Sequence, residues 1–245
     1  MNGENPQPFR ISVAGRIVAI VPRFSLIRAL CRDYLVQDGT AEITVSVSDS
    51  DLARERLLAA EDGEAYPPAY LEALVVYRSI ASQLPRWDAW AFHGSALAID
   101  GQGVLFTAPS GVGKSTHAAL WREVFGSRVR TINDDKPILR RDGSAVWVCG
   151  TPWAGKHGLQ ENTCAPLKAI FLLERGEKNL TVPVTAAQAF PQLLGQSYRP
   201  ADSAEMMRRT LHLVQFASEH IPVYRLCCTI SPEAVQTAYR AMEGK

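Results

Sequence analysis

The sequence lacks a long apolar run and an excess of charge of either sign. Its 245 residues include 26 Lys and Arg against 25 Asp and Glu, a formal net charge of +1. This balance gives no electrostatic drive toward nucleic acid or a membrane surface. No segment reaches the roughly 20 apolar residues of a membrane span, and the polar residues 1–8 contain no apolar signal core. We therefore expect a soluble, cytoplasmic protein with no nucleic-acid or membrane partner.

Cysteines are few, irregularly spaced and odd in number. None belongs to a CxxC pair, so the sequence gives no indication of structural zinc. We expect reduced thiols, as is usual for the cytoplasm. The five positions are Cys31, Cys149, Cys164, Cys227 and Cys228.

The first part of the chain alternates apolar with polar residues, a pattern typical of β-strands. A charged stretch, residues 49–66, has no clear period and is interpreted as a connector. We therefore predict a small β-rich lobe over residues 1–66 and a second domain over residues 67–245, or one continuous domain. The strands predicted in the lobe are 9–13, 17–21 and 43–47.

The sequence after residue 66 predicts an α/β fold around a mixed sheet, with a helical C-terminal part. Apolar residues at helical spacing begin at Tyr70 and end before Pro85. A strand at 91–99 and another at 104–108 are separated by only four residues, which favours an antiparallel hairpin over a parallel crossover. Capping boxes at 185–188 and 202–205 indicate helices. Further strands are predicted at 129–133, 137–140, 145–149 and 169–173.

After the second hairpin strand comes Ala108-Pro-Ser-Gly-Val-Gly-Lys-Ser115, followed by a helical pattern. Strand, Gly-rich loop and helix in this order are typical of a phosphate-binding loop, although the usual motif has glycine where Ala108 stands. Lys114 would reach the β- and γ-phosphates, and the Ser115 hydroxyl would coordinate Mg²⁺. The alternative is a Gly-rich surface turn. The residues predicted to bind nucleotide are Pro109, Ser110, Gly111, Val112, Gly113, Lys114, Ser115 and Thr116.

Two further groups carry candidate chemistry. Asp134 and Asp135 follow a predicted strand downstream of the loop, where one carboxylate would hold Mg²⁺ and the other would accept a hydroxyl proton. His93 lies in the strand that pairs with the loop's strand, and this pairing would bring its imidazole near the γ-phosphate or the two aspartates. The alternative is a structural histidine. A third segment, which is flanked by glycines, offers possible substrate contacts through Trp153, Lys156 and His157. The alternative for Trp153 is a buried core residue, and the alternative for Lys156 and His157 is a solvated turn.

Residues 92–115, with Asn-Asp-Asp135, resemble the catalytic core of the HPr kinase/phosphorylase family, whose fold is similar to that of phosphoenolpyruvate carboxykinase. The separation from His93 to Lys114, 114 − 93 = 21 residues, agrees with that family. The resemblance implies ATP and Mg²⁺ as cofactors, Ser115 as a metal ligand, Asp134 near the metal and Asp135 as the acid/base. It is also compatible with a homo-oligomer. The later family signature with an acidic Mg²⁺ ligand has no counterpart in residues 150–158.

The function expected from these residues is an ATP- and Mg²⁺-dependent kinase. It would transfer the γ-phosphate to a serine-like hydroxyl of a peptide, protein or small molecule. One alternative is a nucleotide-binding regulatory or scaffold protein with little turnover. Another is an enzyme similar to phosphoenolpyruvate carboxykinase. The sequence does not identify the hydroxyl-bearing acceptor.

Overall fold

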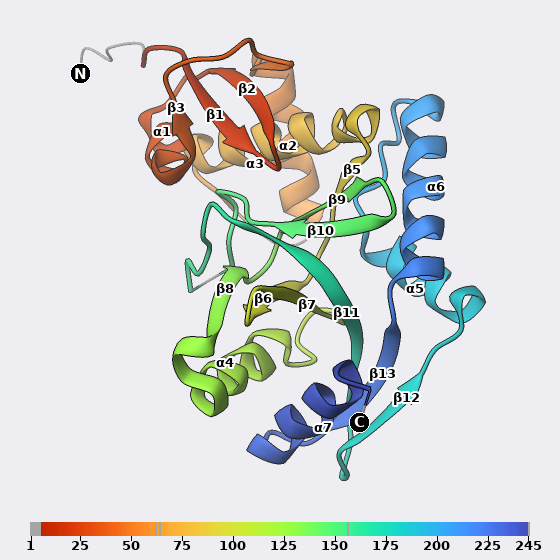
Figure 1. Ribbon diagram of the computed structural model, residues 1–245. Helices are drawn as coiled ribbons and strands as arrows, with labels where there is room; N and C mark the ends of the chain where they lie inside the picture. The colour runs from red at the N-terminus through yellow and green to blue at the C-terminus, as the bar shows by residue number, and fades with distance from the viewer. Residues whose placement is uncertain (1–5, 62, 64, 156, 245) are drawn as a thin grey trace. The chain divides into compact units, whose positions relative to one another are not determined.

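The computed structural model describes residues 6–61, 63, 65–155 and 157–244, which form two compact units, Met1–Gln83 and Leu84–Lys245. Each unit contains a mixed β-sheet and helices, so the chain is a mixed α/β protein (Figure 1). The predicted boundary at residues 66 and 67 falls inside the first unit, because helix α3 packs there against α1, α2 and β4. Within the described residues, no helix is long and apolar enough to cross a membrane.

The first unit is built on a four-stranded sheet in the order β3-β1-β2-β4. Strands β1 and β2 form an antiparallel hairpin, and β4 pairs in parallel with β2. The buried carboxylate of Glu72 accepts hydrogen bonds from the backbone N–H groups of Arg23 and Phe24, which joins α3 to the start of α1. The elements are β1 (Phe9–Val13), β2 (Arg16–Val21), α1 (Ser25–Leu30), the 3₁₀ turn η1 (Arg32–Tyr34), β3 (Leu35–Val36), β4 (Ile43–Ser46), α2 (Asp49–Glu61) and α3 (Pro68–Ala81).

The prediction of an unstructured connector over residues 49–66 is wrong, because helix α2 occupies most of it. Ser48 and Asp51 exchange hydrogen bonds between side chain and backbone that satisfy the helix start. The helix buries one narrow row, Leu52, Glu55 and Ala59, and leaves Leu57 and Leu58 exposed outside it. With a glutamate in the buried row, the apolar period is too weak to predict the helix.

The second unit is built on a nine-stranded sheet whose main path is β5-β9-β10-β11-β7-β6-β8, with β13 and β12 added beside β11. Its elements are η2 (Leu84–Trp87), β5 (Ala89–Ala91), β6 (Ser95–Ile99), β7 (Gln102–Thr107), α4 (Lys114–Phe125), η3 (Gly126–Arg128), β8 (Val129–Asn133), β9 (Ile138–Asp142), β10 (Ala145–Cys149), β11 (Cys164–Arg175), β12 (Leu180–Pro183), α5 (Ala186–Gln196), α6 (Ala204–His220), β13 (Val223–Cys228) and α7 (Pro232–Met242).

The predicted hairpin between β6 and β7 is confirmed: the strands are antiparallel and Ile99 faces Gln102. Asp100 and Gly101 at its tip have φ of +49° and +81°, as tight two-residue hairpin turns require. Strand β11 is longer than the predicted 169–173. Its start pairs antiparallel with β10, and its later residues pair in parallel with β7 and β13.

Alternate residues of β7 supply two separate cores. Val104 and Phe106 pack with Trp121 of α4 and residues of α7, whereas Leu105 joins the core formed with α5 and α6. Complete burial of a side chain such as Phe106 contributes about 1.5–3 kcal/mol. Because both faces of β7 are buried, the position of the segment that follows it is fixed from both sides. The predicted capping box of α5 at Thr185 is confirmed, while the N-cap of α6 is Ser203, one residue after the predicted cap.

Candidate active site

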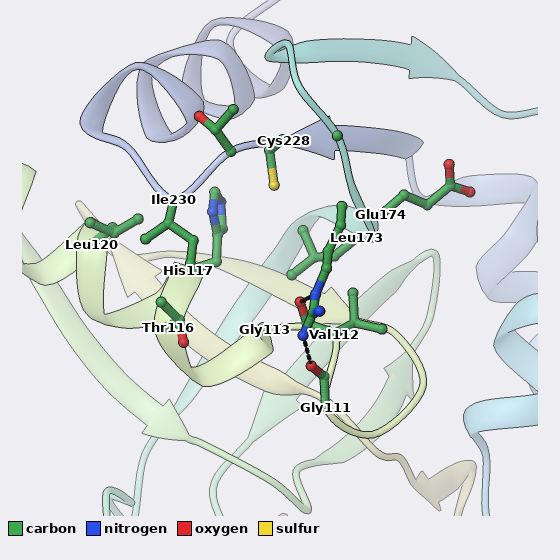
Figure 2. A pocket seen from close by; sticks show the side chains of 13 residues that line it. Gly111, Val112, Gly113, Thr116, His117, Leu120, Leu173, Glu174, Cys228 and Ile230 are labelled. Atoms are coloured by element: carbon green, nitrogen blue, oxygen red, sulfur yellow. Dashed lines mark hydrogen bonds between the residues drawn. The ribbon is translucent and has the colours of Figure 1, made fainter.

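The loop of residues 108–113, here called the glycine loop, joins strand β7 to helix α4 (Figure 2). Gly111 and Gly113 have φ of +79° and +124°, conformations that residues with a side chain rarely adopt. The chain thereby curls in front of the first turn of α4, whose amide groups lack helical partners. Ser115 and Thr116 lie exposed on this turn. Unpaired amides and the positive end of the helix dipole favour an anion at this position.

Lys114 folds back over the glycine loop. Its Nζ atom donates hydrogen bonds to the backbone oxygens of Ala108, at 2.9 Å, and Pro109, at 3.4 Å. Only 8% of the residue is exposed. Burial lowers the pKa of Lys114, and the nearby charge of Asp135 partly offsets this effect. The ammonium group is therefore held beside the loop by two neutral carbonyl oxygens. A charged phosphate oxygen would accept a stronger hydrogen bond from it than either carbonyl does.

Arg175, at the end of β11, holds the outer side of the glycine loop. Its guanidinium donates to Gly111 O at 2.5 Å and to Val112 O at 3.3 Å. These bonds orient two carbonyl groups of the loop toward Arg175. Sequence reasoning missed this residue, and the available signal was an arginine two residues after the end of the strand predicted at 169–173.

Asn133 fixes the turn formed by residues 133–136, here called the Asp turn. Its buried Oδ1 accepts hydrogen bonds from the N–H groups of Asp135 at 2.9 Å and Lys136 at 2.7 Å. Its Nδ2 lies 3.1 Å from Thr151 O and 3.2 Å from Trp153 O. The amide therefore ties the Asp turn to the segment after β10. Sequence reasoning noted Asn133 but gave it no role.

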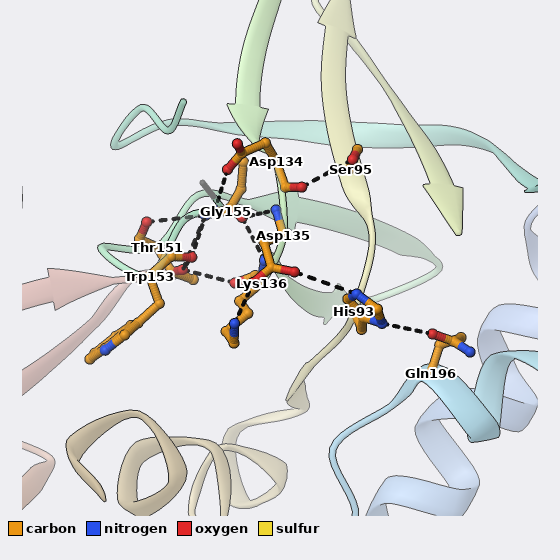
Figure 3. A network of polar contacts seen from close by, with 10 residues as sticks. His93, Ser95, Asp134, Asp135, Lys136, Thr151, Trp153, Gly155 and Gln196 are labelled. Atoms are coloured by element: carbon orange, nitrogen blue, oxygen red, sulfur yellow. Dashed lines mark hydrogen bonds and ion pairs between the residues drawn. The ribbon is translucent and has the colours of Figure 1, made fainter. Parts of the chain in front are cut away.

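Asp135 and His93 lie together, as Figure 3 shows. His93 Nε2 is 3.4 Å from Asp135 Oδ1, and His93 Nδ1 is 3.0 Å from Gln196 Oε1 of helix α5. Lys136 pairs with the other oxygen of Asp135. Burial alone would raise the pKa of Asp135, but the hydrogen bonds and charges of His93 and Lys136 outweigh it and hold the pKa well below its usual range. Asp135 is therefore a carboxylate at any physiological pH.

The sequence-based expectation that His93 lies within a continuous strand is wrong, because β5 ends at Ala91 and β6 begins at Ser95. Between them the backbone bonds to the Asp turn and to α5: Gly94 N–H donates to Asp135 O, and His93 N–H donates to Gln196 O. A Cβ atom at Gly94 would lie 2.8 Å from Phe106 O, so only glycine fits this approach. The break turns the imidazole toward Asp135 instead of into the sheet.

Asp134 points to a different neighbour from Asp135. Its Oδ1 accepts a 2.6 Å hydrogen bond from Gly155 N–H, and its backbone oxygen accepts one from Ser95 Oγ. Its Oδ2 is buried and has no hydrogen-bond partner among the described residues. The two carboxylates therefore separate, with Asp135 beside His93 and Lys114 and Asp134 against Gly155.

Of the three residues proposed to contact a substrate, the structure describes Trp153 and His157. Trp153 is buried, and its backbone oxygen accepts from Asn133. His157 is exposed. Lys156 lies outside the described residues.

Two hollows lie on either side of the glycine loop. One, of about 330 Å³, is bordered by α4 and the residues after β13, and is here called the helix-side cavity (Figure 2). The other, of about 690 Å³, runs from the loop to Gln192 and Gln196 of α5, and is here called the Gln196 groove. Since Gln196 contacts His93, this groove leads from the loop to the residues beside Asp135. Gln196 was also missed, because it lies 103 positions after its partner.

Cys149 and Cys164 form a disulfide, which corrects the expectation that all five cysteines are reduced. They are register partners of β10 and β11, so the ladder itself brings together residues 15 positions apart. The remaining three cysteines are free. In the described part of the chain, no group of three or more His, Cys, Asp or Glu side chains is arranged to hold a metal ion.

Comparisons with known proteins give a distant structural likeness. No protein-family model matches the chain, and no curated protein matches it. Among solved structures, it is similar to the Hpr(Ser) kinase/phosphatase from Coxiella burnetii, with a TM-score of 0.37 and 15% sequence identity over 63% of this chain and 99% of that chain. This is a distant structural resemblance, and it establishes no activity.

Proposed function

We propose that the protein is a kinase that uses ATP and Mg²⁺ to phosphorylate a serine-like hydroxyl of a peptide, protein or small molecule. The supporting observation is the proximity of two features. A glycine loop with an inward-folded Lys114 precedes a helix N-terminus, and a half-buried carboxylate, Asp135, lies close enough for its charge to act on that lysine. A candidate phosphate anchor and a candidate proton acceptor thus lie near each other, which supports phosphoryl transfer.

In this proposal Lys114 exchanges its bonds to the Ala108 and Pro109 carbonyls for bonds to phosphate oxygens. Together with the amides of the glycine loop, it stabilises negative charge on the transferring group. Asp135 accepts a hydrogen bond from the attacking hydroxyl. Its lowered pKa makes it a weak base, so the proton moves to it late, as suits a loose transition state. His93 and Lys136 orient the carboxylate.

Two side chains are suited to hold Mg²⁺, which takes oxygen ligands and commonly one or two carboxylates together with phosphates. Ser115 offers an exposed hydroxyl on the first turn of α4. Asp134 offers the buried Oδ2 that has no partner among the described residues. When bound, the ion would neutralise charge on the β- and γ-phosphates. The phosphate acceptor would approach through the Gln196 groove, which opens beside Asp135's partner His93.

The test is ADP formation from ATP and Mg²⁺ with a panel of hydroxyl-bearing peptides, amino acids and sugars. Lys114→Ala and Asp135→Asn should each lower acceptor-dependent turnover by at least about a hundredfold. Lys178→Ala and Asp142→Asn are matched controls at exposed positions and should leave it unchanged. Equal turnover in Asp135→Asn and the wild type would contradict the role of Asp135.

A second candidate is a nucleotide-binding regulatory protein with little turnover. The ion pair with Lys136 and the lowered pKa of Asp135 favour it, because both make the carboxylate a poorer base. Under this alternative ATP binds, Lys114→Ala abolishes binding, and no acceptor in the panel is phosphorylated.

A further inference from the structure

The helix-side cavity begins where the glycine loop ends. Gly111, Val112 and Gly113 line its entrance, and Thr116 and Leu120 of α4 continue one wall. Phosphates held by the loop would therefore lie at the mouth of this cavity. The Gln196 groove leads from the same loop toward His93 instead. The loop thus separates a side that contains the candidate catalytic groups from a side that does not.

The walls of the cavity are largely apolar. Leu120 and Leu173 line it, and Ile230, after β13, faces Leu120 in Figure 2. Ile230 is 80% exposed, the highest value among the large hydrophobic side chains described. Apolar side chains that remain wet beside a concave surface are typical of a ligand site.

The charged groups around the cavity have partners on the protein. Arg175 donates to two carbonyls of the glycine loop, and Glu174 pairs with Arg225. His117 is neutral near pH 7, since burial lowers its pKa to about 4. Its Nε2 accepts from Trp121 Nε1–H at 3.0 Å, so the ring proton resides on Nδ1. The cavity therefore presents apolar faces, and its uncharged polar side chains include the imidazole of His117 and the hydroxyls of Thr116 and Thr229.

We propose that the helix-side cavity binds the nucleobase of a nucleoside triphosphate, with the aromatic ring between Leu120 and Ile230 and a ring nitrogen or oxygen near His117. This inference rests on the proposed function and extends it by assigning the donor's base to one side of the glycine loop. An aromatic ring matches the apolar walls of the cavity, and its polar edge can accept from the imidazole. Inorganic triphosphate would use the loop alone.

The experiment is calorimetric titration of the full chain with Mg²⁺-ATP and, separately, with Mg²⁺-tripolyphosphate. The wild type should bind ATP at least about tenfold more tightly. Ile230→Ser should weaken ATP binding about tenfold and leave tripolyphosphate binding unchanged, because only the base contacts this side chain. Leu120→Ser should act in the same direction. Leu180→Ser, an exposed leucine on β12 outside the cavity, is the matched control and should alter neither affinity.

The outcomes separate this inference from the proposed function. If tripolyphosphate binds as tightly as ATP and Ile230→Ser changes neither affinity, the cavity does not hold the base, while phosphate binding by the loop stands. If Ile230→Ser weakens both ligands equally, the assignment is also wrong. If the wild type binds neither ligand, the proposed function fails together with the inference.

Discussion

The buried histidine of helix α4 should make folding stability depend on pH. His117 has an ordinary pKa of 6.5 that burial lowers to about 4 in the folded state. As the pH falls below 6.5, the unfolded chain takes up a proton that the folded chain does not, so stability decreases until about pH 4. Between pH 7.5 and pH 5 this linkage amounts to about 2 kcal/mol.

The perturbation is His117→Gln, which removes the titrating group and retains an oxygen able to accept from Trp121 Nε1–H. The variant should be less stable than the wild type at pH 7.5, but its further loss between pH 7.5 and pH 5 should be smaller by about 2 kcal/mol. His212→Gln, at an exposed position on α6, should retain the wild-type pH dependence.

Tryptophan fluorescence during urea unfolding is a suitable assay. All five tryptophans lie beyond residue 83, so their emission follows the second unit alone. Unfolding free energies of the wild type and both variants would be compared at the two pH values. An equal decrease in all three proteins would refute the assignment, because other groups would then account for the pH dependence.

Three further predictions concern how the site is held together. Asn133→Ala should lower the unfolding free energy by about 2–4 kcal/mol, since it leaves buried N–H and C=O groups of the Asp turn and of Thr151 without partners, and urea unfolding would measure this. Gly94→Ala should destabilise the second unit by about 1–3 kcal/mol, because the added Cβ would lie 2.8 Å from Phe106 O. Gly195→Ala in α5 has open space around it and should stabilise the unit by up to about 1 kcal/mol. Thermal unfolding of both variants would measure the two changes. Reduction of the Cys149–Cys164 disulfide, which joins residues 15 positions apart, should lower the unfolding free energy by at most about 3 kcal/mol. The Cys149→Ser, Cys164→Ser double variant should lose this sensitivity to reductant. Peptide mapping without reductant that finds both thiols free would contradict the presence of the disulfide.

Local patterns predicted the parts of the site that depend on neighbouring residues. The β6–β7 hairpin followed from its short turn, and the order of strand, glycine loop and helix α4 followed from glycine spacing and periodicity. In each case the deciding information lies within about ten residues of the feature.

The missed parts depend on contacts between distant segments. Arg175 reaches the glycine loop across 64 positions, and Gln196 reaches His93 across 103. No periodicity records such partners. The break at His93 was missed because residues 91–99 have the composition of one strand, and tertiary bonds to the Asp turn override that local preference. Helix α2 was missed because its buried row includes a glutamate.

The position of β11 between β7 and β13 has a consequence for how the site is acquired during folding. Strand β7 and the glycine loop precede β11 by more than fifty residues, and β13 follows it by nearly fifty. Loop closures of this length slow folding and must be completed before the non-local contacts can stabilise the chain. During synthesis the glycine loop would therefore emerge long before Arg175, Gln196 and Ile230 exist to complete its surroundings. We expect ligand binding to appear late in refolding, after secondary structure, and to stabilise only chains in which β13 has already docked.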